Sequence, residues 1–206
     1  MRIIGPKNKQ SRREGIDLGL KTPGSKSHAS LLRKLNVLPG QHGTRTRRKH
    51  SERARQLREK QKLRFLFGIT ESQLKKYFDK SIRMKGNTAV NLSQLLEKRL
   101  DNVVYRLGFT PTRPSARQLV SHQHIKVNDR IVNVSSYQVT LNDAVGFAGT
   151  KAVKIPAIET SLANKDTLIP KWLERKNTSG KVIAEPSSED IEKQINLRSV
   201  IEFYSR

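Results

Sequence analysis

The sequence predicts an α+β protein, on three observations. Residues 92–107 carry apolar side chains at three- and four-residue spacing, which is the period of an amphipathic helix. Residues 125–134 alternate apolar and polar side chains on either side of an Asn128-Asp129 pair, which indicates a β-hairpin. Residues 1–44 are instead rich in Lys, Arg, Gly, Pro and Ser. We therefore expect a basic N-terminal arm, a mostly helical domain, and a small α/β unit of two helices on a short antiparallel sheet.

The composition implies a polyanionic partner. The chain has 206 residues, with 41 Lys and Arg against 18 Asp and Glu, and a formal net charge of +23. Such an excess is more than solubility requires, and nucleic acid relieves it because each neutralised phosphate releases a condensed counterion. Hydrophobic residues make up 34% of the chain, which allows a modest core. No apolar run has the length of a membrane span, so no membrane partner is expected.

Two helices are predicted ahead of the small unit. Ser51 is a suitable N-cap for a basic helix that runs to Phe67. Thr70 and Gln73 have the spacing of a capping box for the next helix. The apolar stripe of that helix is formed by Leu74, Tyr77, Phe78 and Ile82. We therefore expect Tyr77 and Phe78 to pack in the core rather than to stack on bases. The arm before them has too few apolar residues to offset its own ordering entropy if it is taken alone.

The small unit is predicted to begin with one continuous helix over residues 92–107. Asn91 is its expected N-cap, and Gly108 ends it where a left-handed residue is needed. A second helix starts near Thr112, where Pro114 is tolerated because the first turn has no intrahelical partner for its missing N–H.

The hairpin and its neighbours complete the predicted sheet. Asn128 and Asp129 both tolerate the positive φ of a tight turn. Residues 139–147 suggest further short strands, with Asp143 bonding to the backbone in the turn between them.

The C-terminal part is predicted to contain little regular structure. Residues 156–188 mix Pro, Asn, Ser, Thr and Gly, which favours a loop, a short hydrophobic anchor with Trp172 as a packing residue, and a second loop. Ser188 is a candidate N-cap for a last helix carrying Ile191 and Ile195, followed by an extended VIEFY end.

Several of these stretches resemble one family. RLDNVVYRLGF, TRPSARQLVSH and IKVNDRIVNVSSY resemble the RNA-binding module named after the fourth small-subunit ribosomal protein. The opening MRIIGPKNKQSRREGIDLGLK, the PGQHG turn, QLREKQKLRFLFGI, MKGNT and the ending VIEFYSR resemble the bacterial-type family of that ribosomal protein as a whole. The resemblance covers nearly the whole chain and is least distinctive over residues 150–185.

The resemblance implies a division of the chain and a function. It implies a basic extension over residues 1–44, a helical domain over 45–95 that is completed by 186–206, and an inserted RNA-binding module with its C-terminal extension over 96–185, with a module core at 97–160. It further implies a structural constituent of the small ribosomal subunit. In this family the protein binds small-subunit ribosomal RNA at a multi-helix junction, nucleates assembly of the subunit body and acts in translational accuracy.

The expected partners follow from the same resemblance. They are small-subunit ribosomal RNA, neighbouring small-subunit ribosomal proteins and messenger RNA near the entry channel, with no membrane and no homo-oligomer. The expected place is the ribosome in the cytoplasm of a bacterium, and an organellar version fits the sequence too. Relatives often carry a cysteine zinc cluster in the arm, but this chain has no cysteine. We therefore expect no zinc and no other cofactor.

Two groups of residues are candidates for RNA contact. The first lies before the module, where residues 45–64 carry ten cations against two carboxylates, an imbalance that is self-repulsive without a counter-anion. The second lies on the outward faces of the second helix and the hairpin. The first group is Arg45, Arg47, Arg48, Lys49, Arg53, Arg55, Arg58, Lys62, Arg64 and Lys85. The second group is Arg113, Arg117, Gln118, His122, Lys126, Asn128 and Arg130.

No catalytic constellation is found. The histidines have no metal-ligand spacing, and no phosphate-binding or nucleophile motif is present. Glu97 and Asp101 are predicted to form surface ion pairs with neighbouring Arg and Lys, or Asp101 to hold a neighbouring Arg in place. Two other functions remain open: an RNA-modifying or aminoacylating enzyme that uses the same module, and a free regulator that binds messenger RNA through it.

Overall fold

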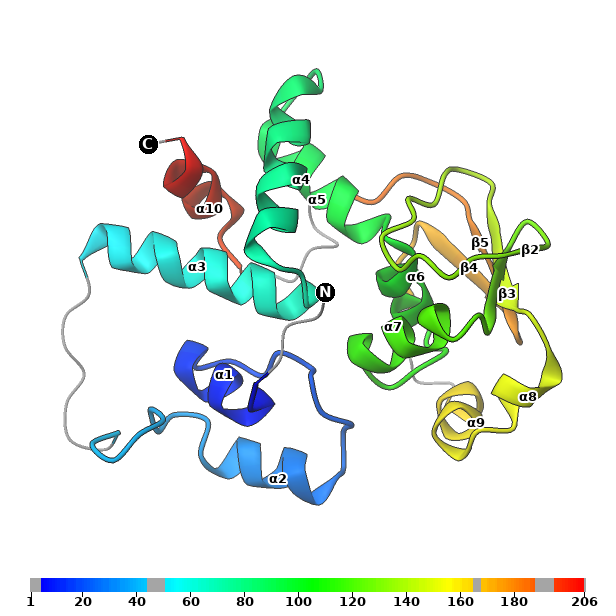
Figure 1. The fold of residues 1–206 in the computed structure, drawn as a ribbon, viewed down its shortest axis with the longest axis horizontal. Helices are drawn as coiled ribbons and strands as arrows, with labels where there is room; N and C mark the ends of the chain where they lie inside the picture. Colours follow the sequence, from blue (N-terminus) through cyan, green and yellow to red (C-terminus); the bar gives the residue numbers. More distant parts are fainter. Residues whose placement is uncertain (1–4, 44–50, 165–167, 188–194, 206) are drawn as a thin grey trace. The chain divides into compact units, whose positions relative to one another are not determined.

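The computed structural model describes residues 5–43, 51–164, 168–187 and 195–205 (Figure 1). The chain forms two compact units. The first comprises Met1–Asn91 and Glu192–Arg206, and the second comprises Leu92–Ile191. The first unit is helical, and the second combines helices with one small sheet, so the α+β class is confirmed.

The N-terminal arm contains two helices and three buried leucines. Helices α1 (Lys7–Glu14) and α2 (Lys26–Arg33) pack together, and α1 also packs on the helix over Glu52–Phe67. Arg12 donates hydrogen bonds to the carbonyl oxygens of Val37 (3.0 Å) and Leu38 (3.2 Å), which ties α1 to the chain beyond α2. Part of what stabilises this segment is therefore polar. The buried leucines of the arm are Leu18, Leu20 and Leu31.

The next two helices have the predicted caps. Helix α3 spans Glu52–Phe67, and the Ser51 side chain accepts a hydrogen bond from the backbone N–H of Ala54. Helix α4 spans Glu71–Arg83, and both hydrogen bonds of the Thr70–Gln73 capping box are present. Both helices are confirmed. Leu74 and Phe78 of the predicted apolar stripe are buried and Tyr77 is half-buried, but the inclusion of Ile82 is wrong, because its side chain is exposed.

The chain ends in a helix rather than in the extended segment that we predicted. Helix α10 spans Leu197–Tyr204 and packs on α3, with Asn196 as its N-cap. The prediction was wrong because Leu197, Val200, Ile201 and Tyr204 repeat with the helical period. The predicted cap Ser188 and the predicted helical residue Ile191 lie outside the described residues, and Ile195 precedes α10.

One polar cluster fixes α10 to the helices beneath it. The buried Lys60 ammonium donates to Glu71 (2.7 Å) and lies 4.4 Å from the centre of the Phe203 ring. The Tyr204 hydroxyl donates to the same Glu71 oxygen (2.7 Å), and its ring stacks on Phe78 at 4.8 Å. Burial and the bond to Glu71 raise the pKa of Tyr204. Burial also acts to raise the pKa of Glu71, but the bonds from Lys60 and Tyr204 outweigh it and lower that pKa.

The predicted continuous helix over residues 92–107 is wrong. The chain forms α5 (Thr88–Glu97) and α6 (Leu100–Arg106), with an extended break at Arg99. There the backbone leaves the helix to pair with Gln138 as a short β-bridge, and Val139 N–H donates to the carbonyl of Lys98 (2.9 Å). A side-chain period cannot reveal this break, because the apolar residues on both sides of it are buried.

Asn91 is not the N-cap that we predicted. It lies inside α5, and its side-chain amide donates to the carbonyls of Ser81, Met84 and Lys85, each at 3.3 Å. It therefore satisfies backbone groups at the C-terminal end of α4 and in the turn beyond it.

The other features predicted for the second unit are largely confirmed. Gly108 has a φ of 71° and follows α6. Helix α7 (Arg113–Ser121) starts as predicted, with the Thr112 side chain accepting from the Ser115 N–H. Strands β1 (Ile125–Val127) and β2 (Arg130–Ile131) form the hairpin, and both turn residues have positive φ.

The sheet is larger than the sequence predicts. It has the order β2-β1-β3-β5-β4, and every pairing is antiparallel. Strand β3 (Ala144–Phe147) realises part of the expected strands over 139–147. The prediction of loops over 156–188 is wrong, because this stretch holds α9 (Pro156–Ala163), β4 (Leu173–Lys176) and β5 (Ser179–Val182). Helix α8 (Thr150–Val153) precedes them.

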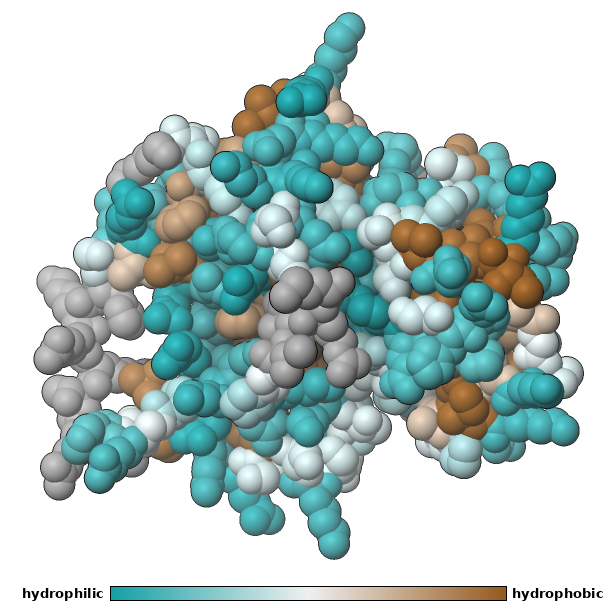
Figure 2. Space-filling model, viewed as in Figure 1, coloured by the Kyte–Doolittle hydropathy of each residue, from teal (hydrophilic) through white to brown (hydrophobic). Residues whose placement is uncertain are grey.

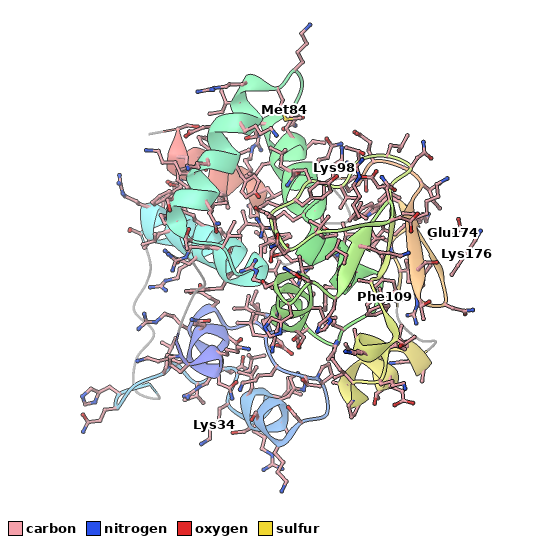
Figure 3. The ribbon with its side chains drawn as sticks, turned by 45° about the vertical axis from the view of Figure 1, so that its right-hand side comes forward. Lys34, Met84, Lys98, Phe109, Glu174 and Lys176 are labelled. Atoms are coloured by element: carbon pink, nitrogen blue, oxygen red, sulfur yellow. The ribbon has the colours of Figure 1, made fainter. Side chains whose placement is uncertain are left out.

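The helices α6 and α7 and the sheet enclose the core of the second unit. Trp172 is buried, as predicted, and the rings of Phe109 (labelled in Figure 3) and Phe147 lie 4.9 Å apart. Gly180 is required where β5 meets Leu107, because a Cβ there would lie 2.5 Å from a Leu107 methyl carbon. The β4–β5 hairpin is therefore an integral part of this core.

Candidate nucleic-acid interface

A buried ionic network lies under the face that we predicted to bind RNA. Asp101 is only 3% exposed and accepts hydrogen bonds from Arg99 (3.1 and 2.8 Å) and from Arg117 (2.9 Å). Its predicted role of holding a neighbouring Arg is confirmed. The alternative of surface pairs worth a few tenths of a kcal/mol is wrong, since Arg99 is buried too.

A second carboxylate extends the network. Glu97 is fully buried and accepts from Arg106 (3.1 and 2.8 Å) and from the Asn102 amide (2.6 Å). Asn102 in turn accepts from Arg113 (2.9 Å), whose guanidinium lies 4.5 Å from the centre of the Tyr105 ring. The prediction that Arg113 points outward is wrong, because it is 6% exposed. These arginines fix α7 to α5 and α6.

The remaining residues of the predicted module face are exposed or half-buried. Gln118 and His122 lie on the outer side of α7 and at its end, and Arg130 lies on the hairpin. Lys126 is half-buried and donates to the exposed Asp129 (2.7 Å), which lowers the pKa of that carboxyl.

Asn128 uses its side chain within the module. Its amide donates to Asp143 (2.6 Å) and its carbonyl accepts from the Ala144 N–H (2.9 Å). Asp143 also accepts from the backbone N–H (2.7 Å) and the hydroxyl (2.9 Å) of Thr140, three residues before it, so it bonds to the turn backbone as predicted but not in the i to i+2 geometry of an Asx turn. The amide of Asn128 therefore positions the hairpin.

The cations of α3 divide into exposed and internally paired side chains. Arg53 and Arg55 are exposed. Arg58 donates to Glu14 (3.2 Å) and Lys62 to Glu59 (2.6 Å).

Arg64 of α3 also lies against groups of the protein itself. Its guanidinium is 3.7 Å from Glu71 and 4.9 Å from the centre of the Phe65 ring. Burial raises the pKa of Glu14, the partner of Arg58, although Arg58 opposes that rise.

The predicted residues Arg45, Arg47, Arg48 and Lys49 lie outside the described residues.

A second cationic surface was not selected from the sequence. Helix α4 exposes Lys75, Lys76, Lys80 and Arg83, and Lys85 follows it. The available signal was the helical period, since the apolar residues of α4 recur on one face and leave these cations on another. Of these five cations only Lys85 was among the predicted contacts, because the dense run of charge over residues 45–64 does not extend to α4.

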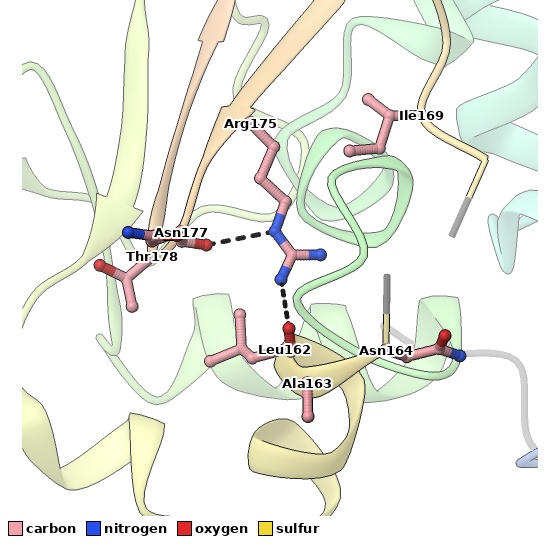
Figure 4. A pocket seen from close by; sticks show the side chains of 7 residues that line it. All are labelled: Leu162, Ala163, Asn164, Ile169, Arg175, Asn177 and Thr178. Atoms are coloured by element: carbon pink, nitrogen blue, oxygen red, sulfur yellow. Dashed lines mark hydrogen bonds between the residues drawn. The ribbon is translucent and has the colours of Figure 1, made fainter. Parts of the chain in front are cut away.

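The hollow beside Arg175 is a structural site rather than a reaction centre (Figure 4). The Arg175 guanidinium donates to the carbonyls of Asn177 (3.1 Å), Leu162 (2.8 Å) and Leu107 (3.3 Å). It thereby satisfies carbonyl groups at the ends of α9 and α6. Within the described ranges, the hollow is lined by one hydroxyl, that of Thr178, and by no carboxylate, histidine or cysteine that could activate it.

The arm has no cysteine with which to hold a zinc cluster. The Nε2 atom of His28 lies 2.7 Å from Asp17. Across the parts of the chain that the structure describes, no three His, Cys, Asp or Glu side chains gather as metal ligands do. No helix among the same residues has both the length and the apolar character to cross a bilayer.

The fold and these surfaces define a nucleic-acid-binding protein built from a basic helical unit and a small α/β module. The family model described as "Ribosomal protein S4/S9 N-terminal domain" matches residues 2–97, and the model described as "S4 domain" matches residues 98–145. Proteins named "Small ribosomal subunit protein uS4" from Xanthomonas campestris pv. campestris (strain B100), Xanthomonas axonopodis pv. citri (strain 306) and Xanthomonas oryzae pv. oryzae (strain PXO99A) are each 44% identical over 209 aligned positions, covering 100% of this chain and 99% of theirs. The chain belongs to the uS4 family of small ribosomal subunit proteins.

Proposed function

We propose that this protein binds small-subunit ribosomal RNA at a junction of several helices, nucleates assembly of the subunit body and contributes to translational accuracy. As a member of the uS4 family it is a structural, RNA-binding constituent of the small ribosomal subunit and not an enzyme. The RNA-modifying enzyme considered from the sequence is therefore set aside. Its place is the ribosome, and we propose the bacterial cytoplasm as the compartment.

The observation that carries the junction proposal is that both units present exposed cations. In the first unit they lie on α3 and α4, and in the second on the hairpin. A folded protein that contacts several RNA helices through separate surfaces fixes their mutual angles and offsets the repulsion between their phosphates. Aromatic residues make up 5% of the chain, which favours recognition of RNA shape and backbone over stacking.

We propose two roles for the residues selected from the sequence. Direct contacts are assigned to the exposed or half-buried members that the structure describes and, on their charge in the sequence alone, to the four cations of residues 45–49. Positioning roles are assigned to those bound within the protein. The proposed contacts are Arg45, Arg47, Arg48, Lys49, Arg53, Arg55, Lys85, Gln118, His122, Lys126 and Arg130. The proposed positioning residues are Arg58, Lys62, Arg64, Arg113, Arg117 and Asn128.

Further partners are part of the same proposal. We propose that the protein contacts neighbouring small-subunit ribosomal proteins and messenger RNA near the entry channel. We also propose that it acts as a single copy and forms no homo-oligomer. Binding of free messenger RNA through the same surface, as a regulator, is compatible with this function. We also propose that the arm, the helical domain and the module engage separate parts of the RNA.

The module contacts are tested with the double variant Lys126→Gln and Arg130→Gln, which removes both positive charges. Loss of two phosphate contacts is expected to weaken binding to a junction-containing ribosomal RNA fragment and to reduce the slope of log affinity against log salt by about two. The thermal transition is expected to stay unchanged, because Arg130 is exposed and Lys126 forms its ion pair with Asp129, which is also exposed. Titrations at several salt concentrations provide the measurement.

The matched control neutralises Lys171 and Lys181, two exposed cations of the same unit outside the proposed face. This variant has the same net charge, and its slope is expected to equal that of the wild type. Equal affinities and slopes for both variants and the wild type would show that the hairpin does not contact the RNA.

A further inference from the structure

Helix α4 is held firmly along one side. Leu74, Phe78 and Ser81 are buried, and the Phe78 ring stacks on Tyr204 of α10. The Asn91 amide bonds to carbonyls at the C-terminal end of the helix. Its opposite side is therefore presented in a fixed orientation within the first unit.

That opposite side is cationic. At about 100° per residue, the exposed Lys75, Lys76, Lys80 and Arg83 fall within an arc of about 140° on the helix surface. Asp79 is the one carboxylate of α4 within this arc. In the described part of the chain, no hydrogen bond or ion pair joins any of these four cations to another side chain. Hydrophilic side chains cover much of α4 in Figure 2, beside a small hydrophobic patch.

The fold itself explains only part of this charge. Cations in the last turn of a helix are favoured by its dipole, which accounts for Lys80 and Arg83. It does not account for Lys75 and Lys76, which lie in the first half of the helix, or for Lys85 beyond its end. Four like charges on so short a surface repel one another unless an anion lies against them.

We propose that this face of α4, together with Lys85, docks against the phosphate backbone of a double-helical segment of ribosomal RNA. This inference rests on the proposed function and adds a contact surface to it. Lys76, Lys80 and Arg83 form a row with steps of about 6 Å and about 4.5 Å along the helix axis, so they can follow the phosphates of one strand. The arc carries no aromatic side chain, so the contact reads backbone shape and not bases.

A protein partner fits this surface less well. Ile82 and Met84, which is labelled in Figure 3, are the exposed apolar side chains at this end of α4. Two such side chains fall far short of the roughly 800 Å² that each partner buries in a stable protein interface. The charge of the surface fits RNA directly.

The test neutralises the row with Lys76→Gln, Lys80→Gln and Arg83→Gln in the full-length protein. Binding to naked small-subunit ribosomal RNA is measured at several salt concentrations, together with hydroxyl-radical footprints. We expect weaker binding and a slope of log affinity against log salt that is smaller by two to three, which is about one for each lost contact. We also expect loss of protection over one duplex segment, while other segments stay protected. The control variant neutralises Lys154, Lys171 and Lys181 and is expected to keep the wild-type slope and footprint.

A second variant tests for a gain. Asp79→Asn removes the one carboxylate of this arc, so it is expected to tighten RNA binding severalfold at low salt, a result that misfolding cannot produce. If the wild type binds but the triple variant and Asp79→Asn both match it, the α4 surface does not face RNA and this inference is wrong. If the wild type shows neither salt-dependent binding nor protection, the proposed function itself fails.

Discussion

Replacing Asp101 with Ala is expected to cost about 3–5 kcal/mol of stability in the second unit, because it leaves the buried Arg99 guanidinium without its carboxylate partner. Arg99 is 2% exposed and donates two hydrogen bonds to Asp101, and Arg117 donates to the same side chain. A loss of this size is a large part of the about 5–15 kcal/mol that stabilises a typical domain. Trp172 is the only tryptophan of the chain, so its fluorescence during urea denaturation reports the unfolding of this unit.

Asp129→Asn is the control for this prediction. Asp129 also pairs with a cation, Lys126, but it lies on the exposed turn of the hairpin. An exposed pair contributes little, so the urea midpoint of this variant should stay close to that of the wild type. Equal midpoints for the Asp101 and Asp129 variants would show that the buried network does not hold the module together.

Replacing Trp172 with Ala is expected to destabilise the second unit by about 3–5 kcal/mol, since it opens a large cavity in the core. Trp172 is 2% exposed, and its carbonyl accepts from the Ile183 N–H, which links the start of β4 to the chain after β5. Circular dichroism during thermal and urea denaturation measures the loss.

Trp172→Phe provides the matched comparison. Phe keeps most of the apolar contact and removes the buried Nε1 atom, which has no hydrogen-bond partner among the residues that the structure describes. It should therefore lose much less stability than the Ala variant. If both variants unfold at the same midpoint as the wild type, Trp172 is not part of the core that the structure describes.

The sequence predicts well the features that local chemistry determines. Ser51, the Thr70–Gln73 capping box and Thr112 mark helix starts, because their side chains bond to the nearest free backbone N–H groups. Asn128-Asp129 identifies its turn for a similarly local reason. The surplus of positive charge, together with the resemblance, pointed to RNA.

The features that the sequence does not predict depend on contacts between distant residues. The break at Arg99 exists because the backbone pairs with Gln138, far along the chain. The burial of Arg113 depends on Asn102, eleven positions away and on another helix. Charge density alone could not separate Arg53, which is exposed, from Lys60, which is buried against Glu71. The candidate site was therefore predicted as a charged region, but not as a division between contacting and positioning side chains.

The most direct test of the account is a hydroxyl-radical footprint of the full-length protein on naked small-subunit ribosomal RNA, at low and at high salt. The account predicts protection of strands from several helices that meet at one junction, and loss of that protection as salt rises, because phosphate contacts supply the affinity. Protection confined to a single isolated hairpin, or protection that persists unchanged at high salt, would contradict it.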